Sequence, residues 1–80
     1  MVRTILSGDD VYLFNYLREK KDVDRRELSE GDDRILRRVS SFSHLRQLSE
    51  EGFIDMEADI SFEDYVIRLI EKGVNYLKNL

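Results

Sequence analysis

The segment from Arg34 to Ser49 carries side chains that can bind phosphate groups and the edges of nucleic-acid bases. It contains four arginines and no acidic residue. Arginine pairs with phosphate oxygens or with the acceptor edge of guanine, and Ser or Gln can hydrogen-bond to bases or phosphates. The candidate contact residues are Arg34, Arg37, Arg38, Ser40, Ser43, His44, Arg46 and Gln47. Among them, Arg34 and Arg46 are expected to contact phosphates.

An alternative explains the same arginines without any partner molecule. They can pair with acidic residues of the chain itself and simply keep the helix solvated. The acids that flank the segment are Asp32, Asp33, Glu50 and Glu51. In the same way, a lone histidine such as His44 is more typical of an exposed, solvated side chain than of a catalytic group.

Other kinds of functional site are not indicated. The chain has no Cys and one His, which excludes disulfides, thiolate zinc sites and a His-based zinc site. The adjacent acids Asp9–Asp10, Asp32–Asp33 and Glu63–Asp64 are more typical of helix caps than of metal ligands, and EF-hand spacing is missing. Neither a glycine-rich phosphate loop nor a nucleophile motif occurs. We therefore expect no metal, no cofactor and no enzymatic activity.

The charges fall into two neighbouring blocks of opposite sign. The net charge is −4, which by itself disfavours nucleic acid. Residues 34–49, however, carry +4 from four arginines, and residues 50–64 carry −7 from seven acids without a base. Such blocks suggest two surfaces with different roles, the second of which suits a basic protein partner. The alternative is two ordinary solvated faces.

The length predicts one domain, residues 1–80, near the lower limit for a self-sufficient core. Small domains often gain further burial by self-association. The apolar residues in Met1–Leu6 and Val74–Leu80 are therefore the predicted contacts of a homodimer. Because there is no apolar run of about 18 residues and no charged-then-apolar leader, we expect a cytoplasmic protein without membrane contact.

Two helices are expected in the first third of the chain. Ser7 is a candidate N-cap followed by first-turn acids, and the wide apolar stripe that follows predicts a central helix over Val11–Lys21. Residues 22–24 leave room only for a short strand. Asp24 and Glu27 have the spacing of a capping box, which predicts a short second helix over Arg25–Glu30.

The helix that carries the candidate site has an irregular apolar pattern. Its apolar residues recur every three positions: Leu36, Val39, Phe42, Leu45 and Leu48. On a straight helix each such step rotates the stripe by about 60°. Either the helix bends, or two helices meet near Ser40–Ser41. In both cases Phe42, Leu45 and Leu48 are expected inside, which leaves Ser40, Ser43, His44 and Gln47 outside.

The last third allows two interpretations. Phe53–Glu57 and Tyr65–Leu69 resemble antiparallel strands of a hairpin. Alternatively, Ser61 caps one long helix that runs to Leu80. Both interpretations place a helix over Lys72–Leu80. The aromatic residues along the chain, Tyr12 among them, fall mainly on the expected buried stripes and are assigned to the core.

Three passages are similar to winged helix-turn-helix domains of small archaeal and bacterial regulators. Residues 23–29 (VDRRELS) resemble the entry to their second helix, residues 43–54 (SHLRQLSEEGFI) the end of the recognition helix and the first wing strand, and residues 68–73 (RLIEKG) the second wing strand and closing helix. Two features depart from that pattern. Ile70 stands where Thr usually caps the last helix, and the expected wing tip is acidic rather than basic.

The resemblance implies an α+β fold: a mainly helical winged helix-turn-helix with a two- or three-stranded β wing and a C-terminal helix. It also implies a DNA-binding transcriptional regulator that reads duplex DNA through the helix within residues 34–50, as a homodimer. The alternative implied by the same fold is a winged-helix protein-interaction module that uses the acidic surface of residues 50–64.

Overall fold

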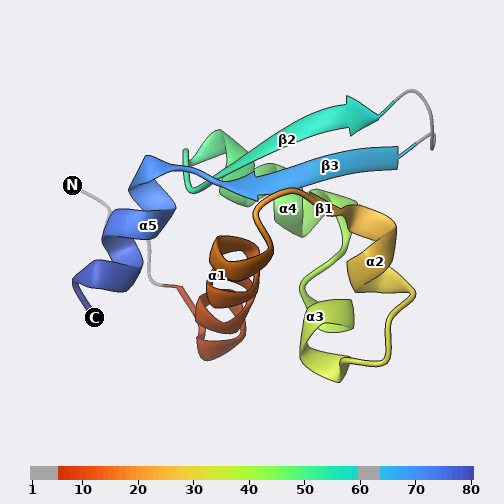
Figure 1. Cartoon of the computed structure of the whole chain (residues 1–80), viewed down its shortest axis with the longest axis horizontal. Helices are drawn as coiled ribbons and strands as arrows, with labels where there is room; N and C mark the ends of the chain where they lie inside the picture. The colour runs from red at the N-terminus through yellow and green to blue at the C-terminus, as the bar shows by residue number, and fades with distance from the viewer. Residues whose placement is uncertain (1–5, 60–63) are drawn as a thin grey trace.

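Helices pack against one small sheet (Figure 1). The computed structural model describes residues 6–59 and 64–80. Within these ranges the protein is a compact α+β domain with five helices and a three-stranded antiparallel sheet, which confirms the predicted class. The elements are α1 (Gly8–Lys20), β1 (Val23–Asp24), α2 (Arg25–Ser29), α3 (Arg34–Arg38), α4 (Phe42–Glu50), β2 (Ile54–Asp59), β3 (Asp64–Leu69) and α5 (Glu71–Lys78). The predicted dimer contacts at residues 1–5 lie outside the described ranges.

The central helix α1 begins at a reciprocal capping box. The backbone N–H of Asp10 donates to Ser7 Oγ at 3.3 Å, and the Asp10 carboxylate accepts from the backbone N–H of Ser7 at 3.2 Å. These bonds satisfy N–H groups that have no partner within the helix. The predicted N-cap is therefore confirmed. The helix buries Leu13, Phe14 and Leu17 completely against the rest of the domain.

The short helix α2 is capped differently from the expectation. Asp24 accepts from the backbone N–H of Arg26 at 2.8 Å, so its N-cap role is confirmed. The reciprocal half of the predicted capping box is wrong, because the Glu27 carboxylate accepts from the hydroxyl of Tyr16 at 2.8 Å instead. Glu27 thus joins α2 to α1 rather than closing its own helix.

The hairpin interpretation of the last third is confirmed, and the single long helix is wrong. The strand order is β1-β3-β2, with β3 in the middle and both pairings antiparallel. Ile67 lies opposite Val23 on one side and Met56 on the other. Residues that lie directly opposite each other on neighbouring strands project from the same face of a sheet, so Val23, Ile67 and Met56 form an apolar row on one face. Ser61, the expected cap of the rejected helix, lies outside the described residues.

Gly52 ends α4 and directs the chain into the sheet. It has φ 85°, in the left-handed region that glycine adopts without steric cost. Its N–H donates to Ser49 O at 3.0 Å, and the N–H of Phe53 donates to Leu48 O at 3.1 Å. This bond pair is a Schellman motif, which satisfies the last carbonyl groups of the helix.

The closing helix α5 packs closely against the domain at Gly73. A Cβ atom at that position would lie 2.5 Å from Phe53 O, so only glycine permits this approach. As expected, the N-cap residue Ile70 makes no side-chain capping bond. Tyr76 of α5 completes an aromatic cluster with Phe14 of α1 and Phe53, whose ring centroids lie 5.7 to 6.3 Å apart.

The buried core connects all of these elements. Its apolar members are Leu6, Leu13, Phe14, Leu17, Val23, Leu28, Leu36, Val39, Leu45, Leu48, Phe53, Ile54 and Ile67. In Figure 1, α1 lies below the sheet with α5 on one side of it and α2 and α3 on the other. Within the described parts of the chain, every helix is too short or too polar to cross a membrane.

Candidate nucleic-acid interface

The candidate segment forms two helices, α3 and α4, that meet at residues 39–41. Asp33 caps α3 by accepting from the backbone N–H groups of Ile35 and Leu36. Ser41 caps α4 by accepting from the N–H of His44 at 3.3 Å. Of the two possibilities that the apolar pattern allowed, the break near Ser40–Ser41 is the one that occurs. Each helix therefore has its own inward side.

The inward side of α4 is formed by Leu45 and Leu48, as expected, and both are buried. Residues advance by about 100° along a helix, so positions 43, 46 and 47 fall on the opposite side. Ser43, Arg46 and Gln47 are exposed there. Three of the eight candidate contact residues thus share one exposed polar surface on a single helix.

Ser40 is placed differently from the expectation. Only 3% of the residue is exposed, and its hydroxyl donates to Arg37 O at 2.7 Å. Its expected outward position is wrong because Ser40 lies in the junction between the helices, where the hydroxyl satisfies a carbonyl group at the end of α3.

Phe42 and His44 are also placed differently. Phe42 was expected inside but is 41% exposed, because it lies in the first turn of α4, about 60° from Leu45 and about 120° from Leu48, at the edge of the buried side. His44 was expected outside but is half-buried, with Nε2 2.6 Å from Asp10 Oδ1. Asp10 is itself buried and belongs to the capping box of α1, so His44 connects α4 to the start of α1.

The four arginines of the segment divide into two pairs. Arg38 forms an ion pair with Asp9 at 3.1 Å, and Arg46 forms one with Glu50 at 3.1 Å. Both pairs are exposed, and such pairs contribute little stability, so either arginine can exchange its carboxylate for another anion at small cost. Arg34 and Arg37 are exposed and make no ion pair within 4.0 Å to any residue in the described parts of the chain.

The carboxylate of Asp33 is bonded to α1 rather than to these arginines. The hydroxyl of Tyr12 donates to Asp33 Oδ2 at 2.5 Å. This bond lowers the pKa of Asp33, assisted by the backbone N–H groups that Asp33 caps and by the charge of Arg37, and it raises the pKa of Tyr12. The carboxylate of Asp33 is thus used to cap α3 and to bind α1. This explains how Arg37 remains without an ion pair so close to an acid.

Arg25 is a residue that the sequence analysis did not single out. Its Nε lies 2.9 Å from Asp64 Oδ1 at the start of β3, and its guanidinium donates to Ser40 O at 3.1 Å. The Asp64 side chain is only 5% exposed. One side chain of α2 therefore joins the β2–β3 hairpin to the junction before α4. No local pattern could reveal this contact, because Asp64 is 39 residues away in the chain.

Several acids of the block of residues 50–64 have a basic partner within the described part of the chain. Arg68 lies 3.0 Å from Asp22, 3.7 Å from Asp55 and 3.9 Å from Glu57. Asp64 is neutralised by Arg25. The surface that suited a basic partner in the sequence is thus less negative in the folded chain than the count of acids indicates.

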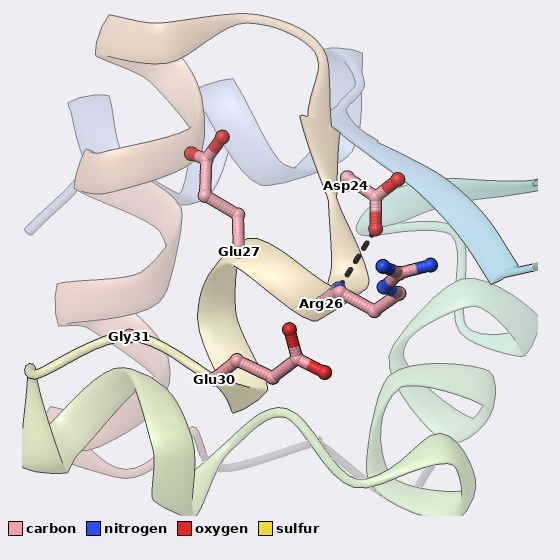
Figure 2. A pocket seen from close by; sticks show the side chains of 5 residues that line it. All are labelled: Asp24, Arg26, Glu27, Glu30 and Gly31. Carbon is pink, nitrogen blue, oxygen red and sulfur yellow. Dashed lines mark hydrogen bonds between the residues drawn. The ribbon is translucent and has the colours of Figure 1, made fainter. Parts of the chain in front are cut away.

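An open hollow lies beside α2 (Figure 2). Its lining residues are Asp24, Arg26, Glu27, Glu30 and Gly31. The carboxylates of Asp24 and Glu27 already take part in the hydrogen bonds of the fold described above. Within residues 6–59 and 64–80, no group of three or more His, Asp or Glu side chains is placed to hold a metal ion.

The chain was compared with models of known protein families, with curated proteins and with solved structures, and none of the three comparisons gave a match. The chain is a small α+β domain. Its most distinctive surface is the exposed polar side of α4 together with the arginines of α3 that precede it. Function has to be inferred from this geometry.

Proposed function

We propose that the chain is a winged-helix DNA-binding regulator that reads duplex DNA with α4. The observation that carries this proposal is the division of α4 into two sides. Leu45 and Leu48 fix the helix to the core, and Ser43, Arg46 and Gln47 project from its opposite, exposed side. A helix that is anchored in this way can enter the major groove without any change in its own packing.

The arginines of α3 support the proposal because they are available to bind DNA phosphates. Arg34 and Arg37 are exposed and lack an ion pair to any described residue, so they can neutralise phosphates without first losing a partner. Arg38 and Arg46 can contribute after release from exposed pairs with Asp9 and Glu50. Phosphate neutralisation supplies most of the non-specific affinity for DNA. A protein with a negative net charge therefore has to gather its basic side chains on the surface that faces the DNA.

The arrangement of the other elements also suits a winged helix. The resemblance implies the order helix, short strand, two helices, two-stranded hairpin and helix, and the chain follows it except that three helices, α2 to α4, lie between β1 and the hairpin. In this proposal the β2–β3 hairpin is the wing and β1 its third strand. Ser40 and His44 are left out of the interface, because the first is buried and the second is bonded to Asp10.

The proposal is tested by salt-dependent binding to duplex DNA. The double variant Arg34→Ala/Arg37→Ala is expected to bind roughly tenfold more weakly at low salt than the wild type. Because two phosphate contacts are lost, the slope of log K against log salt should become shallower by about two. Fluorescence anisotropy with a labelled random duplex, measured over a series of salt concentrations, gives both quantities.

A matched control separates contact from overall charge. Lys20→Ala/Lys78→Ala also removes two exposed cations, but from the last turns of α1 and α5. Its affinity and salt slope should stay close to those of the wild type. Equal weakening in both double variants, or wild-type binding no tighter than millimolar at low salt, would reject the proposal.

We further propose that the regulator acts as a homodimer through α5. Val74, Tyr76 and Leu77 are only partly covered, and Leu80 is 72% exposed. A symmetric dimer would present two copies of α4 to half-sites about 34 Å apart.

The expected result is a dimer in light scattering at high micromolar concentration and a shift toward monomer for Leu80→Glu. Replacing an exposed apolar residue with a charge disfavours its burial in an interface. Asn75→Glu adds the same charge at an exposed position of α5 and should leave the dimer intact. A wild-type protein that is strictly monomeric at this concentration would contradict the homodimer and leave the DNA-binding proposal in place.

A further inference from the structure

Phe42 is an exposed aromatic residue on the first turn of α4. Within the described ranges, the large apolar side chains that are exposed are Tyr12, Phe42 and Leu80. Tyr12 has its hydroxyl bonded to Asp33, and Leu80 belongs to the proposed dimer surface. The exposure of Phe42 is not explained by either kind of contact. Most other large apolar residues in the described ranges are buried or partly buried, whereas this one is left in contact with water.

The ring of Phe42 is held in place rather than free to rotate into the core. It packs against Tyr65 of β3, with ring centroids 5.1 Å apart and an angle of 46° between the ring planes. Around the axis of α4, Phe42 lies about 40° from Arg46 and about 60° from Leu45. It therefore stands at the border of the exposed polar surface, on the side of α4 that adjoins the β2–β3 hairpin.

We infer that Phe42 determines sequence specificity by packing against the C5-methyl group of thymine in the major groove. The inference rests on the proposed function, because it requires α4 to lie in that groove. Thymine is the base that presents an apolar group there, and phenylalanine is one of the side chains that contact it. Tyr65 supports one part of the ring and leaves the rest, 41% of the residue, available to the base.

A ring that is already oriented loses little conformational freedom on binding. The side chains of Arg46 and Gln47, by comparison, have several rotatable bonds that must be ordered at the interface. The contact also removes apolar surface of both partners from water, which is favourable in proportion to the area buried. Phe42 thus provides selectivity for A·T pairs at one position of each half-site.

The test removes the methyl group alone. A duplex selected by the wild-type protein from a random pool is resynthesised with uracil in place of thymine, one position at a time. Uracil keeps the Watson–Crick hydrogen bonds of thymine and lacks the C5-methyl group. The wild type is expected to bind about three- to fivefold more weakly at one or two positions, which corresponds to one methyl group no longer buried.

The same substitutions are measured with Phe42→Ala, in which the loss at those positions should disappear. Phe42→Leu, which keeps an apolar contact to Tyr65, should show an intermediate loss and remain folded by circular dichroism. Glu19→Ala changes an exposed residue of α1 that has no part in the proposed interface and should retain the full effect of the methyl group.

Two outcomes would overturn the inference while leaving the proposed function in place: no thymine at which uracil weakens binding, or an equal loss in the wild type and Phe42→Ala. A Phe42→Ala variant that loses self-association instead would assign the ring to a protein contact and would also overturn it. Absence of DNA binding by the wild type would remove the proposed function itself, and the inference with it.

Discussion

Replacement of Arg25 with methionine is expected to lower the free energy of unfolding by about 3 kcal/mol. The variant leaves the carboxylate of Asp64 without its ion pair. This is costly because only 5% of that side chain is exposed, so water cannot replace the lost partner. It also removes the donor that binds Ser40 O. Breaking a buried pair typically costs about 3–5 kcal/mol, and the partial exposure of Arg25 favours the lower end of this range. Urea denaturation followed by circular dichroism measures the change.

The double variant Arg25→Met/Asp64→Asn provides the control. It removes the uncompensated charge, so part of the lost stability should return and the effects of the two substitutions should not add. A loss below about 0.5 kcal/mol for Arg25→Met is typical of an exposed pair. That result, or strict additivity, would mean that the contact between α2 and β3 is not the connection that the geometry indicates.

Truncation of Phe14 to alanine is expected to cost about 3–5 kcal/mol of unfolding free energy. The side chain is completely buried in α1 and forms the centre of the aromatic cluster with Phe53 and Tyr76. Domains of this length have a total stability of roughly 4–12 kcal/mol, so the variant should be largely unfolded at moderate temperature. Thermal denaturation of Phe14→Ala and Phe14→Leu tests this.

Phe14→Leu keeps most of the apolar volume and should lose considerably less stability than Phe14→Ala. If the two variants melt at the same temperature as the wild type, α1 is not the helix on which α5 and the start of β2 depend. The exposed residue Glu19 on the same helix provides a reference position, because its truncation creates no cavity.

Local rules predicted most of the elements correctly. Ser7 and Asp24 were identified as helix N-caps, and each acts as one by accepting a hydrogen bond from a backbone N–H two or three residues further along the chain. The hairpin was recognisable because Tyr65–Leu69 is rich in β-branched and aromatic residues. Such features depend on neighbours in the chain, and a single sequence displays them directly.

The candidate site was predicted less well, for a physical reason. An apolar period shows which side of a helix faces inward only while the helix continues. Phe42 and His44 both follow the break at Ser40–Ser41 and lie at opposite edges of the side of α4 that Leu45 and Leu48 bury, so the spacing did not decide which of the two would be covered, and both assignments were wrong. The partners of His44 and Arg38 are Asp10 and Asp9, which lie 34 and 29 residues earlier, and no local spacing announces such contacts. The pair of Arg46 with Glu50, four residues apart, was among the alternatives considered.

The middle strand of the sheet is the last strand in the chain, and this order constrains how the domain can be assembled. Both β1 and β2 hydrogen-bond to β3 and not to each other. The pairing of Val23 with Ile67 closes a long loop, which costs more chain entropy than a local contact. A nascent polypeptide that has been synthesised only as far as α4 can form helices, but β1 still lacks β3, the strand with which it pairs. Completion of the sheet, and with it the ion pair between Arg25 and Asp64, therefore has to wait until β3 has been synthesised.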